Sequence, residues 1–219
     1  MKRIVSFMMI LAFLFSFTSL GQAKKKKWKI SISLEKVIIE SNLDKKSHDA
    51  NANSFSDDLI KIQWRPEPKE LNFELHNKGD VPITIMWENS GFIDEMEKIH
   101  KIIHAKVELK QTPKPMEPTI IPPGGSITDM VYPRDYASPQ PEIESVQDFR
   151  SGAVTTYEKM KWVKREIYPK KVTLKEMKKK DKDFDIATYL ENNKYKVILA
   201  IKINEKNYNY HFLFKSVEN

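Results

Sequence analysis

The sequence predicts a mainly β protein, an antiparallel two-sheet sandwich with a long irregular insertion and one or two short helices. Short runs of residues alternate between apolar and polar, which is typical of strands that bury one face. Turn-forming residues separate these runs, and the long helical crossovers that parallel strands need are missing. We therefore predict a single domain over residues 24–219, with an excursion from its core at about 133–190.

The N-terminus has the three-part pattern of a secretory signal peptide. Two positive charges precede an apolar run over residues 4–20, and Gly21-Gln22-Ala23 places small residues at a cleavage point after Ala23. We predict export to the periplasm or the extracellular space, with residues 1–23 removed and no transmembrane segment left. The alternative is a membrane anchor formed by uncleaved residues 4–20, because the four lysines at 24–27 resist export.

The first strands follow from alternation. Residues 30–39 predict one strand, and the polar residues 41–58 predict a loop after it. Residues 60–64 predict the next strand, which two prolines end. Residues 71–75 and 81–87 each place their apolar side chains on one face. Because the turn between them contains a glycine, we expect these two runs to pair as a hairpin.

The rest of the chain is assigned in the same way. Residues 102–109 and 119–132 predict strands, whereas the prolines, serines and scattered acids of residues 133–158 predict an excursion from the core. A capping-box pattern beginning at Thr173 predicts a short helix that ends near Lys180.

The C-terminus predicts a second hairpin. Apolar residues alternate along 195–203 and aromatic residues along 208–214. We expect Ile203 to lie opposite Tyr208, so that aliphatic and aromatic side chains form a ladder on one face of the sheet. This ladder is expected to belong to the core, because one face of the sheet must be covered.

Charge and composition narrow the class of partner. The chain of 219 residues has a net charge of +7 and no cysteine, which excludes disulfides, thiol catalysis and thiolate metal sites. Most basic residues are lysine, whereas recognition of phosphates and bases favours arginine, so we expect no nucleic-acid partner. An envelope protein, or an anionic glycan or lipid surface, is the expected partner.

Several runs share a pattern of strand and turn positions: NFELHNKGDVPI (72–83), WENSGFID (87–94), HKIIH (100–104), IIPPG (120–124) and the final hairpin at 200–214. Together they resemble a group of exported bacterial proteins with immunoglobulin-like sandwiches and poorly defined roles, many of them lipoproteins. The resemblance implies an immunoglobulin-like antiparallel two-sheet sandwich and implies no catalytic residues. This chain lacks the cysteine that carries the lipid in such lipoproteins.

The residues that we predict for partner binding are Trp162, Lys161, Lys164 and Arg165. An exposed aromatic ring flanked by lysines suits an anionic glycan or a protein partner. The predicted function is therefore that of an exported, non-catalytic binding or envelope-support protein that uses no cofactor.

The alternative is a metal- or carboxylate-dependent hydrolase of envelope polymers, centred on His100, His104 and Asp94. The two histidines have the spacing of zinc ligands on one helical turn. On a strand they would stand about 13 Å apart, too far for one ion. The alternative therefore requires residues 95–106 to form a helix, or a fold that brings more distant ligands together.

Overall fold

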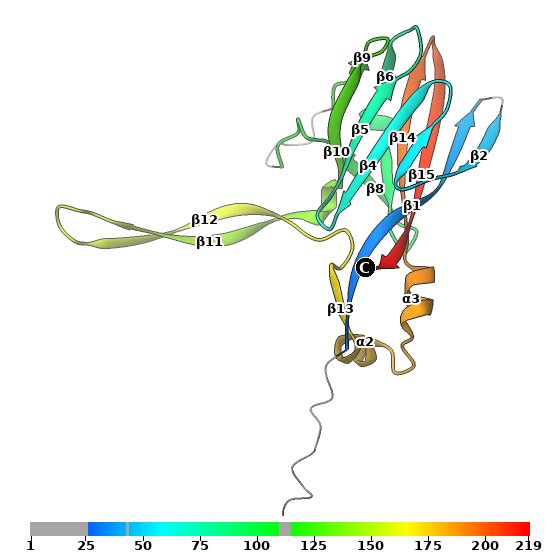
Figure 1. Cartoon of the computed structure of the whole chain (residues 1–219). Coiled ribbons are helices and arrows are strands. Elements are labelled where there is room, and N and C mark those ends of the chain that lie inside the picture. The colour runs from blue at the N-terminus through cyan, green and yellow to red at the C-terminus, as the bar shows by residue number, and fades with distance from the viewer. Residues whose placement is uncertain (1–25, 43, 110–114) are drawn as a thin grey trace, which may run out of the picture.

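A computed structural model describes residues 26–42, 44–109 and 115–219 of the chain. The predicted signal peptide, and its alternative as a membrane anchor, lie outside these residues. Within the described ranges, no helix is both long and apolar enough to span a membrane. As predicted, this part of the chain is mainly β and antiparallel (Figure 1).

The strands are connected by turns and by a few short helical segments. The strands are β1 (Lys27–Ser41), β2 (Lys45–Asp49), β3 (Ser54–Ser56), β4 (Ile60–Glu67), β5 (Glu70–Asn77), β6 (Ile83–Ile85), β7 (Gly91–Ile93), β8 (Ile99–Ile103), β9 (Thr119–Ile121), β10 (Ser126–Pro133), β11 (Ala137–Gln147), β12 (Val154–Lys164), β13 (Lys171–Thr173), β14 (Lys194–Ile203) and β15 (Lys206–Glu218). The helical segments are η2 (Trp87–Asn89), η3 (Arg134–Tyr136), α2 (Leu174–Lys180) and α3 (Ile186–Asn192).

The body of the molecule is one antiparallel sheet that curls on itself. Its strands follow the order β13-β1-β15-β14-β7-β8-β10-β5-β4-β3, with β2 beside β1 and with β6 between β14 and β9. The two halves of the curl enclose the core. Trp64 on β4 lies across from Phe212 and Phe214 on β15, at ring-centroid distances of 5.1 and 5.4 Å. These contacts between distant strands hold the curl together.

The predicted hairpin of residues 71–75 with 81–87 is wrong. Leu75 on β5 lies opposite Ile62 on β4 and Ile127 on β10 instead. The buried side chain of Asn77 explains the change, because its Nδ2 donates to the carbonyls of Val81, Ile121 and Pro122. These bonds fix the chain as it leaves β5, and β6 then pairs with β14 and β9. Alternation predicted the buried face but could not identify the partner strand.

The C-terminal hairpin is confirmed, with a register two residues from the predicted one. Ile203 lies opposite Lys206, and Ile201 opposite Tyr208. A two-residue turn replaces the predicted longer one, because Asn204 and Glu205 adopt φ angles of 46° and 62°. A shift of two residues leaves every side chain on its predicted face, so the aliphatic and aromatic ladder remains buried.

One other segment contains more regular structure than the sequence predicts, and one predicted helix is present. Residues 41–58, predicted as a loop, contain the short strands β2 and β3. The predicted helix at Thr173 is confirmed, and the backbone N–H of Glu176 donates to the Thr173 hydroxyl at 3.3 Å. The helix ends at Lys180, as predicted.

The excursion at 133–190 is not an irregular insertion. Residues 137–164 form a regular two-stranded ribbon of β11 and β12, which we call the arm, and β13, α2 and α3 follow it. Pro139 and Pro141 obscured the alternation of β11 in the sequence. They lie opposite Trp162 and Met160. Because proline has no N–H, both occupy pairs in which β11 donates no hydrogen bond to β12.

Candidate functional site

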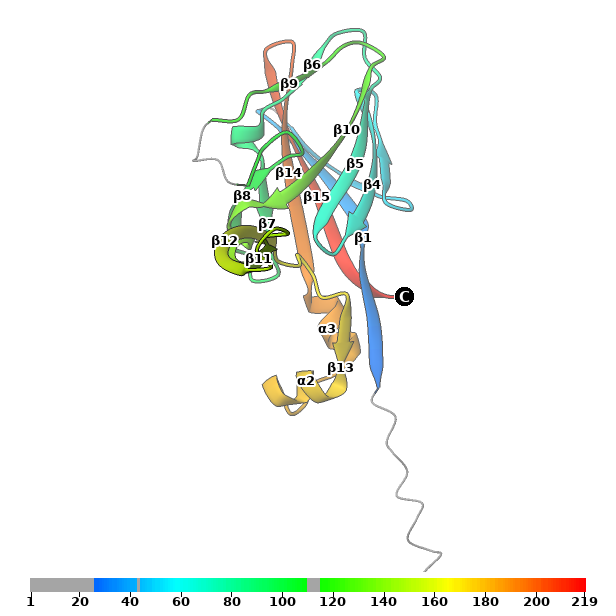
Figure 2. The ribbon, with the colours of Figure 1, turned by 90° about the vertical axis from the view of Figure 1, so that its left-hand side faces the viewer.

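The arm is the feature of this fold most directly available to a partner. Figure 1 shows it projecting sideways from the body, and in Figure 2 it points toward the viewer. Its strands pair without interruption from Ala137 opposite Lys164 to Gln147 opposite Val154. The hydrogen bonds and ion pairs of residues 140–161 join residues of the arm to one another. The arm is therefore surrounded by solvent along most of its length.

One face of the arm is polar and internally paired. Tyr157 donates to Glu144 at 2.7 Å, Lys159 lies 3.3 Å from the same carboxylate, and Lys161 lies 2.9 Å from Glu142. All five side chains occupy the same face, because residues directly opposite in an antiparallel pair point the same way. These pairs match the charges across the two strands and leave this face hydrated.

The other face of the arm is apolar near the body and mixed toward the tip. It presents Pro139, Pro141, Ile143, Val154, Met160 and Trp162, together with Ser145, Gln147, Thr156 and Glu158, of which Glu158 lies directly opposite Ile143. The side chains of Ile143, Val154 and Met160 are exposed, and Phe149 in the turn at the tip is 98% exposed. Single exposed apolar residues are ordinary on a protein surface, whereas a contiguous row of them marks an interaction site.

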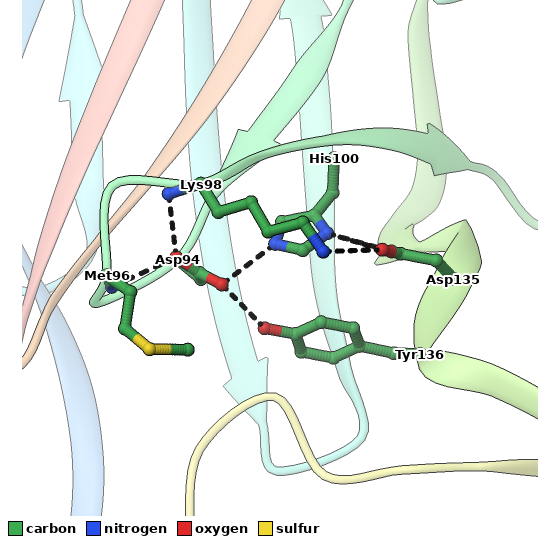
Figure 3. Close-up of polar contacts among 6 residues, drawn as sticks. All are labelled: Asp94, Met96, Lys98, His100, Asp135 and Tyr136. Carbon is green, nitrogen blue, oxygen red and sulfur yellow. Dashed lines mark hydrogen bonds and ion pairs between the residues drawn. The ribbon is translucent and has the colours of Figure 1, made fainter.

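The root of the arm, residues 132–136 and 164–165, is fixed to the body by a buried polar cluster (Figure 3). His100 on β8 lies between two carboxylates. Its Nε2 is 2.9 Å from Asp94 Oδ2, and its Nδ1 is 2.8 Å from Asp135 Oδ1. The Tyr136 hydroxyl donates to Asp94 at 3.3 Å. Since Asp135 and Tyr136 belong to η3, directly before β11, the cluster sets where the arm leaves the body.

Burial is the largest single influence on the pKa of Asp94 and raises it. The hydrogen bonds to this carboxylate together lower the pKa by more than burial raises it. The donors are His100 and the backbone N–H groups of Lys98 and Met96, and the net pKa is below the ordinary value of 3.8. Burial raises the pKa of Tyr136 to about 12, and the charge on Asp94 adds to this shift. The Tyr136 hydroxyl therefore stays neutral and donates its proton to the ionised carboxylate.

Basic residues complete the root from the β12 side. Arg165 lies over the ring of Tyr136 at 3.8 Å, and its backbone N–H donates to the Tyr136 carbonyl at 3.0 Å. Lys164 is 2.7 Å from Glu70 and 5.1 Å from the ring centroid of Tyr132. Both strands of the arm are thus anchored where they meet the body.

The predicted binding residues lie together at the inner end of β12. Lys161 is on the polar face and Trp162 is half-buried on the apolar face, whereas Lys164 and Arg165 are engaged in the root. The sequence prediction thus places all four residues at or directly beside one end of β12. It missed Asp135, Tyr136 and Phe149. The alternation of Glu142 and Glu144 with apolar neighbours was the available signal for the strand.

The residues of the alternative metal site are divided between two pairs. Residues 99–103 form strand β8, so the helical requirement for residues 95–106 is not met. His100 lies with Asp94, whereas His104 Nδ1 lies 3.1 Å from Asp129 on β10. Among the described side chains, no group of three or more histidines and acids is placed to hold a metal ion.

His104 stabilises the body at a second point. Its ring stacks on Trp87 at a centroid distance of 4.3 Å, and Asp129 also accepts from the backbone N–H of Ala105 at 2.8 Å. Burial raises the pKa of Asp129, but the hydrogen bonds from His104, Ala105 and Met130 together lower it by more. The net pKa of Asp129 is therefore below its ordinary value. This pair ties the segment after β8 to β10.

The cluster around His100 is suited to holding structure rather than to transferring protons. Each ring nitrogen of His100 lies within hydrogen-bond distance of a carboxylate, Nδ1 at 2.8 Å from Asp135 and Nε2 at 2.9 Å from Asp94. Both nitrogens are therefore occupied, and neither is left for a substrate.

No protein-family model, no curated protein and no solved structure matches the chain. The arm and its root are the features from which a function is inferred below.

Proposed function

We propose that this protein is an exported, non-catalytic binding protein that contacts a protein partner with its arm. The observation that carries the proposal is the amphipathic ribbon of residues 137–164, whose apolar face and Phe149 tip are exposed. The body would act as the support that holds this ribbon at a fixed place, through the cluster of Asp94, His100 and Asp135.

The curled sheet would be a variant of the immunoglobulin-like sandwich of the exported proteins that the chain resembles. The contacts of Trp64 with Phe212 and Phe214 support this proposal, because they join two opposed halves of the sheet across a common core. The N-terminal sequence pattern supports export after cleavage behind Ala23.

A protein partner fits the arm better than an anionic glycan or lipid does. Lys161 and Lys164 are already paired with Glu142 and Glu70. The arm as a whole is formally neutral, since residues 137–164 contain four acidic and four basic residues: Glu142, Glu144, Asp148 and Glu158 against Arg150, Lys159, Lys161 and Lys164. A neutral apolar face offers contact area instead of long-range attraction to an anionic surface.

The hydrolase alternative is not favoured by the geometry of its residues. His100 has both ring nitrogens bonded to carboxylates, and His104 lies with a different carboxylate, Asp129.

Site-specific photo-crosslinking in the native host tests this function. A photoreactive residue in place of Phe149 should give a covalent adduct with a protein of the envelope. The same residue in place of Lys61, exposed on β4, should give none. The mass of the recovered chain should lack residues 1–23. Equal labelling from both positions, or an adduct with lipid or glycan alone, would contradict the proposal.

A further inference from the structure

One end of the body carries a dense group of lysines, which we call the base. The base consists of residues 26–29, at the start of β1, and residues 170–182, which include β13 and α2. These segments are held together, because β1 pairs with β13 and the backbone N–H of Leu174 donates to the Lys26 carbonyl at 3.2 Å. Figures 1 and 2 both show β13 and α2 at the end of the molecule opposite the β14–β15 turn.

The base concentrates the positive charge of the molecule. It contains two acidic residues, Glu176 and Asp181, and ten lysines, so its formal net charge is +8. The lysines are Lys26, Lys27, Lys29, Lys170, Lys171, Lys175, Lys178, Lys179, Lys180 and Lys182. The rest of the chain after residue 23 contains 25 basic and 28 acidic residues, a net charge of −3. The processed molecule would therefore have one strongly basic end and a slightly acidic remainder.

The lysines of the base have no acidic partners. All ten are exposed, and among the described residues none of them forms an ion pair. Elsewhere in the molecule, lysines such as Lys159 and Lys215 are paired with glutamates. The acids of the base bond to other groups: Glu176 accepts from the Thr173 hydroxyl at 2.5 Å, and Asp181 accepts from a backbone N–H after α2. The positive charge of the base is thus left uncompensated.

The fold also brings these like charges close together. Lys29 on β1 lies directly opposite Lys171 on β13, so their side chains share a face, an arrangement that destabilises a sheet. On α2, Lys175 and Lys179 lie one turn apart, where like charges also repel. Glu218 and the C-terminal carboxylate, at the end of β15 beside β1, reduce the local net charge only to +6. An anionic surface against the base would relieve this repulsion.

We infer that the base binds the anionic lipid headgroups of a membrane surface. This inference goes beyond the proposed function, with which it shares only export, because the arm takes no part in it. A lysine ammonium is a compact point charge, whereas an arginine fork recognises one phosphate or carboxylate in a fixed geometry. The base contains no arginine. It therefore suits a surface of many mobile headgroups, to which clusters of lysines are attracted.

The place of the base in the sequence favours lipid over an anionic glycan. The base begins at Lys26, and the apolar run of residues 4–20 ends only a few residues before it. Export would insert that run into a bilayer until the chain is cleaved behind Ala23. The base is thus the part of the fold that is nearest in sequence to the bilayer when the chain is released.

A membrane contact at the base is compatible with a protein contact at the arm. In Figure 1 the arm leaves the body above α2 and runs across the long axis of the molecule. A bilayer beneath the base would therefore leave the arm in solvent, and both contacts could form at once.

Co-sedimentation with lipid vesicles tests the inference on the chain from Lys24 onward, which retains the whole described core. Vesicles of phosphatidylcholine with about one-third phosphatidylglycerol supply anionic headgroups, and vesicles of phosphatidylcholine alone supply none. The base variant is the triple substitution Lys171→Gln, Lys175→Gln and Lys179→Gln.

The matched control removes the same charge elsewhere. It is the triple substitution Lys61→Gln, Lys106→Gln and Lys206→Gln, at exposed positions outside the base. In the described part of the chain these three lysines, like those of the base, form no ion pair. The two variants therefore have equal net charge and differ in where the charge is lost.

The wild-type chain and the control should bind the anionic vesicles and not the phosphatidylcholine vesicles. The base variant should bind about 100-fold more weakly, because each lysine near an anionic surface contributes about a factor of five. Arginine at the same three positions keeps the charge and should keep the binding. Salt at about 1 M should release the wild-type chain, because the Debye length is then about 3 Å.

Three results would overturn the inference: no binding of the wild-type chain to the anionic vesicles, equal weakening in both glutamine variants, or weak binding of the arginine variant. Tighter binding to polygalacturonate than to the vesicles, compared per anionic group, would assign the base to a glycan and would also overturn it.

These outcomes are separate from those of the arm. A chain that ignores anionic vesicles but still crosslinks to an envelope protein from the Phe149 position would overturn the lipid contact and leave the proposed function intact. A chain that binds the vesicles through the base and gives no crosslink from the arm would overturn the proposed function alone.

Discussion

His100 and Asp94 show how two buried polar residues can determine the position of a distant surface. Both side chains are 2% exposed, and their partners Asp135 and Tyr136 directly precede the arm. Removing one partner of a buried pair leaves the other without compensation, which costs more than the pair itself contributes. The cluster therefore belongs to the structural support of the arm.

Asp94→Asn should destabilise the protein if the buried pair has this structural role, and the loss of stability should depend on pH. The folded-state pKa of Asp94 lies below its ordinary value of 3.8. Its ionised form thus stabilises the fold above that value and loses this effect as the pH falls through the folded-state pKa. We expect the variant to be less stable by about 2 kcal/mol at pH 7, with the difference shrinking below pH 3.8. Urea unfolding across this range measures it.

Asp135→Asn is the matched control, because this carboxylate contacts the same histidine but is 52% exposed. Its loss should cost less than about 1 kcal/mol. A difference between wild type and Asp94→Asn that stays constant down to pH 2, as a lower limit for a hydrogen-bonded carboxylate, would contradict the assigned role of Asp94.

At the scale of elements, the β14–β15 hairpin depends on a strained turn. Asn204 and Glu205 both have positive φ, a conformation that asparagine tolerates and that costs glutamate about 1 kcal/mol. The strands on either side bury the ladder of aliphatic and aromatic residues, so the hairpin forms in spite of this cost.

Glu205→Gly should therefore stabilise the protein, by about 0.5–1 kcal/mol in urea unfolding. Glu205→Ala provides the control, because it also removes the exposed ion pair with Lys202 but keeps a side chain at positive φ. If alanine stabilises as much as glycine, the turn is not strained in the way described.

The strands also show which parts of the fold could be predicted from the sequence. Alternation placed Trp64, Phe212 and Phe214 in the core correctly, because burial of one face is a local property of a strand. The partners of β5 were not predictable in this way. They depend on Asn77, which bonds to carbonyls 44 and 45 residues further along the chain. At the candidate site, the sequence showed that Trp162 is aromatic and Lys164 is basic. It could not show that Trp162 lies opposite Pro139 in the arm or that Lys164 pairs with Glu70.

At the scale of the whole molecule, the arm and the body are separate in their interactions. The ion pairs of residues 140–161 stay within the ribbon, and the core lies entirely within the body apart from the root residues. Under the proposed function, stability and recognition therefore belong to different parts of one chain, and each can change without the other.

Shortening the arm tests this separation. Ser138 and Val163 lie directly opposite each other and form a hydrogen-bonded pair next to the non-bonded pair of Pro139 and Trp162, so an Asn-Gly turn can join them in place of residues 139–162. We expect the free energy of unfolding of the body to change by less than about 1 kcal/mol, while crosslinks made through the arm are lost. A drop of several kcal/mol would mean that the arm is part of the folding unit.

Pro139 and Pro141 carry one more consequence. An exposed strand edge is a template on which further chains can add and grow into fibres. Two outward-facing positions of β11 lack an N–H, so an incoming strand would find donors missing on that edge. A protein that displays a bare, partly apolar ribbon in a crowded compartment runs a risk of runaway polymerisation. These two residues confine that risk to the β12 edge.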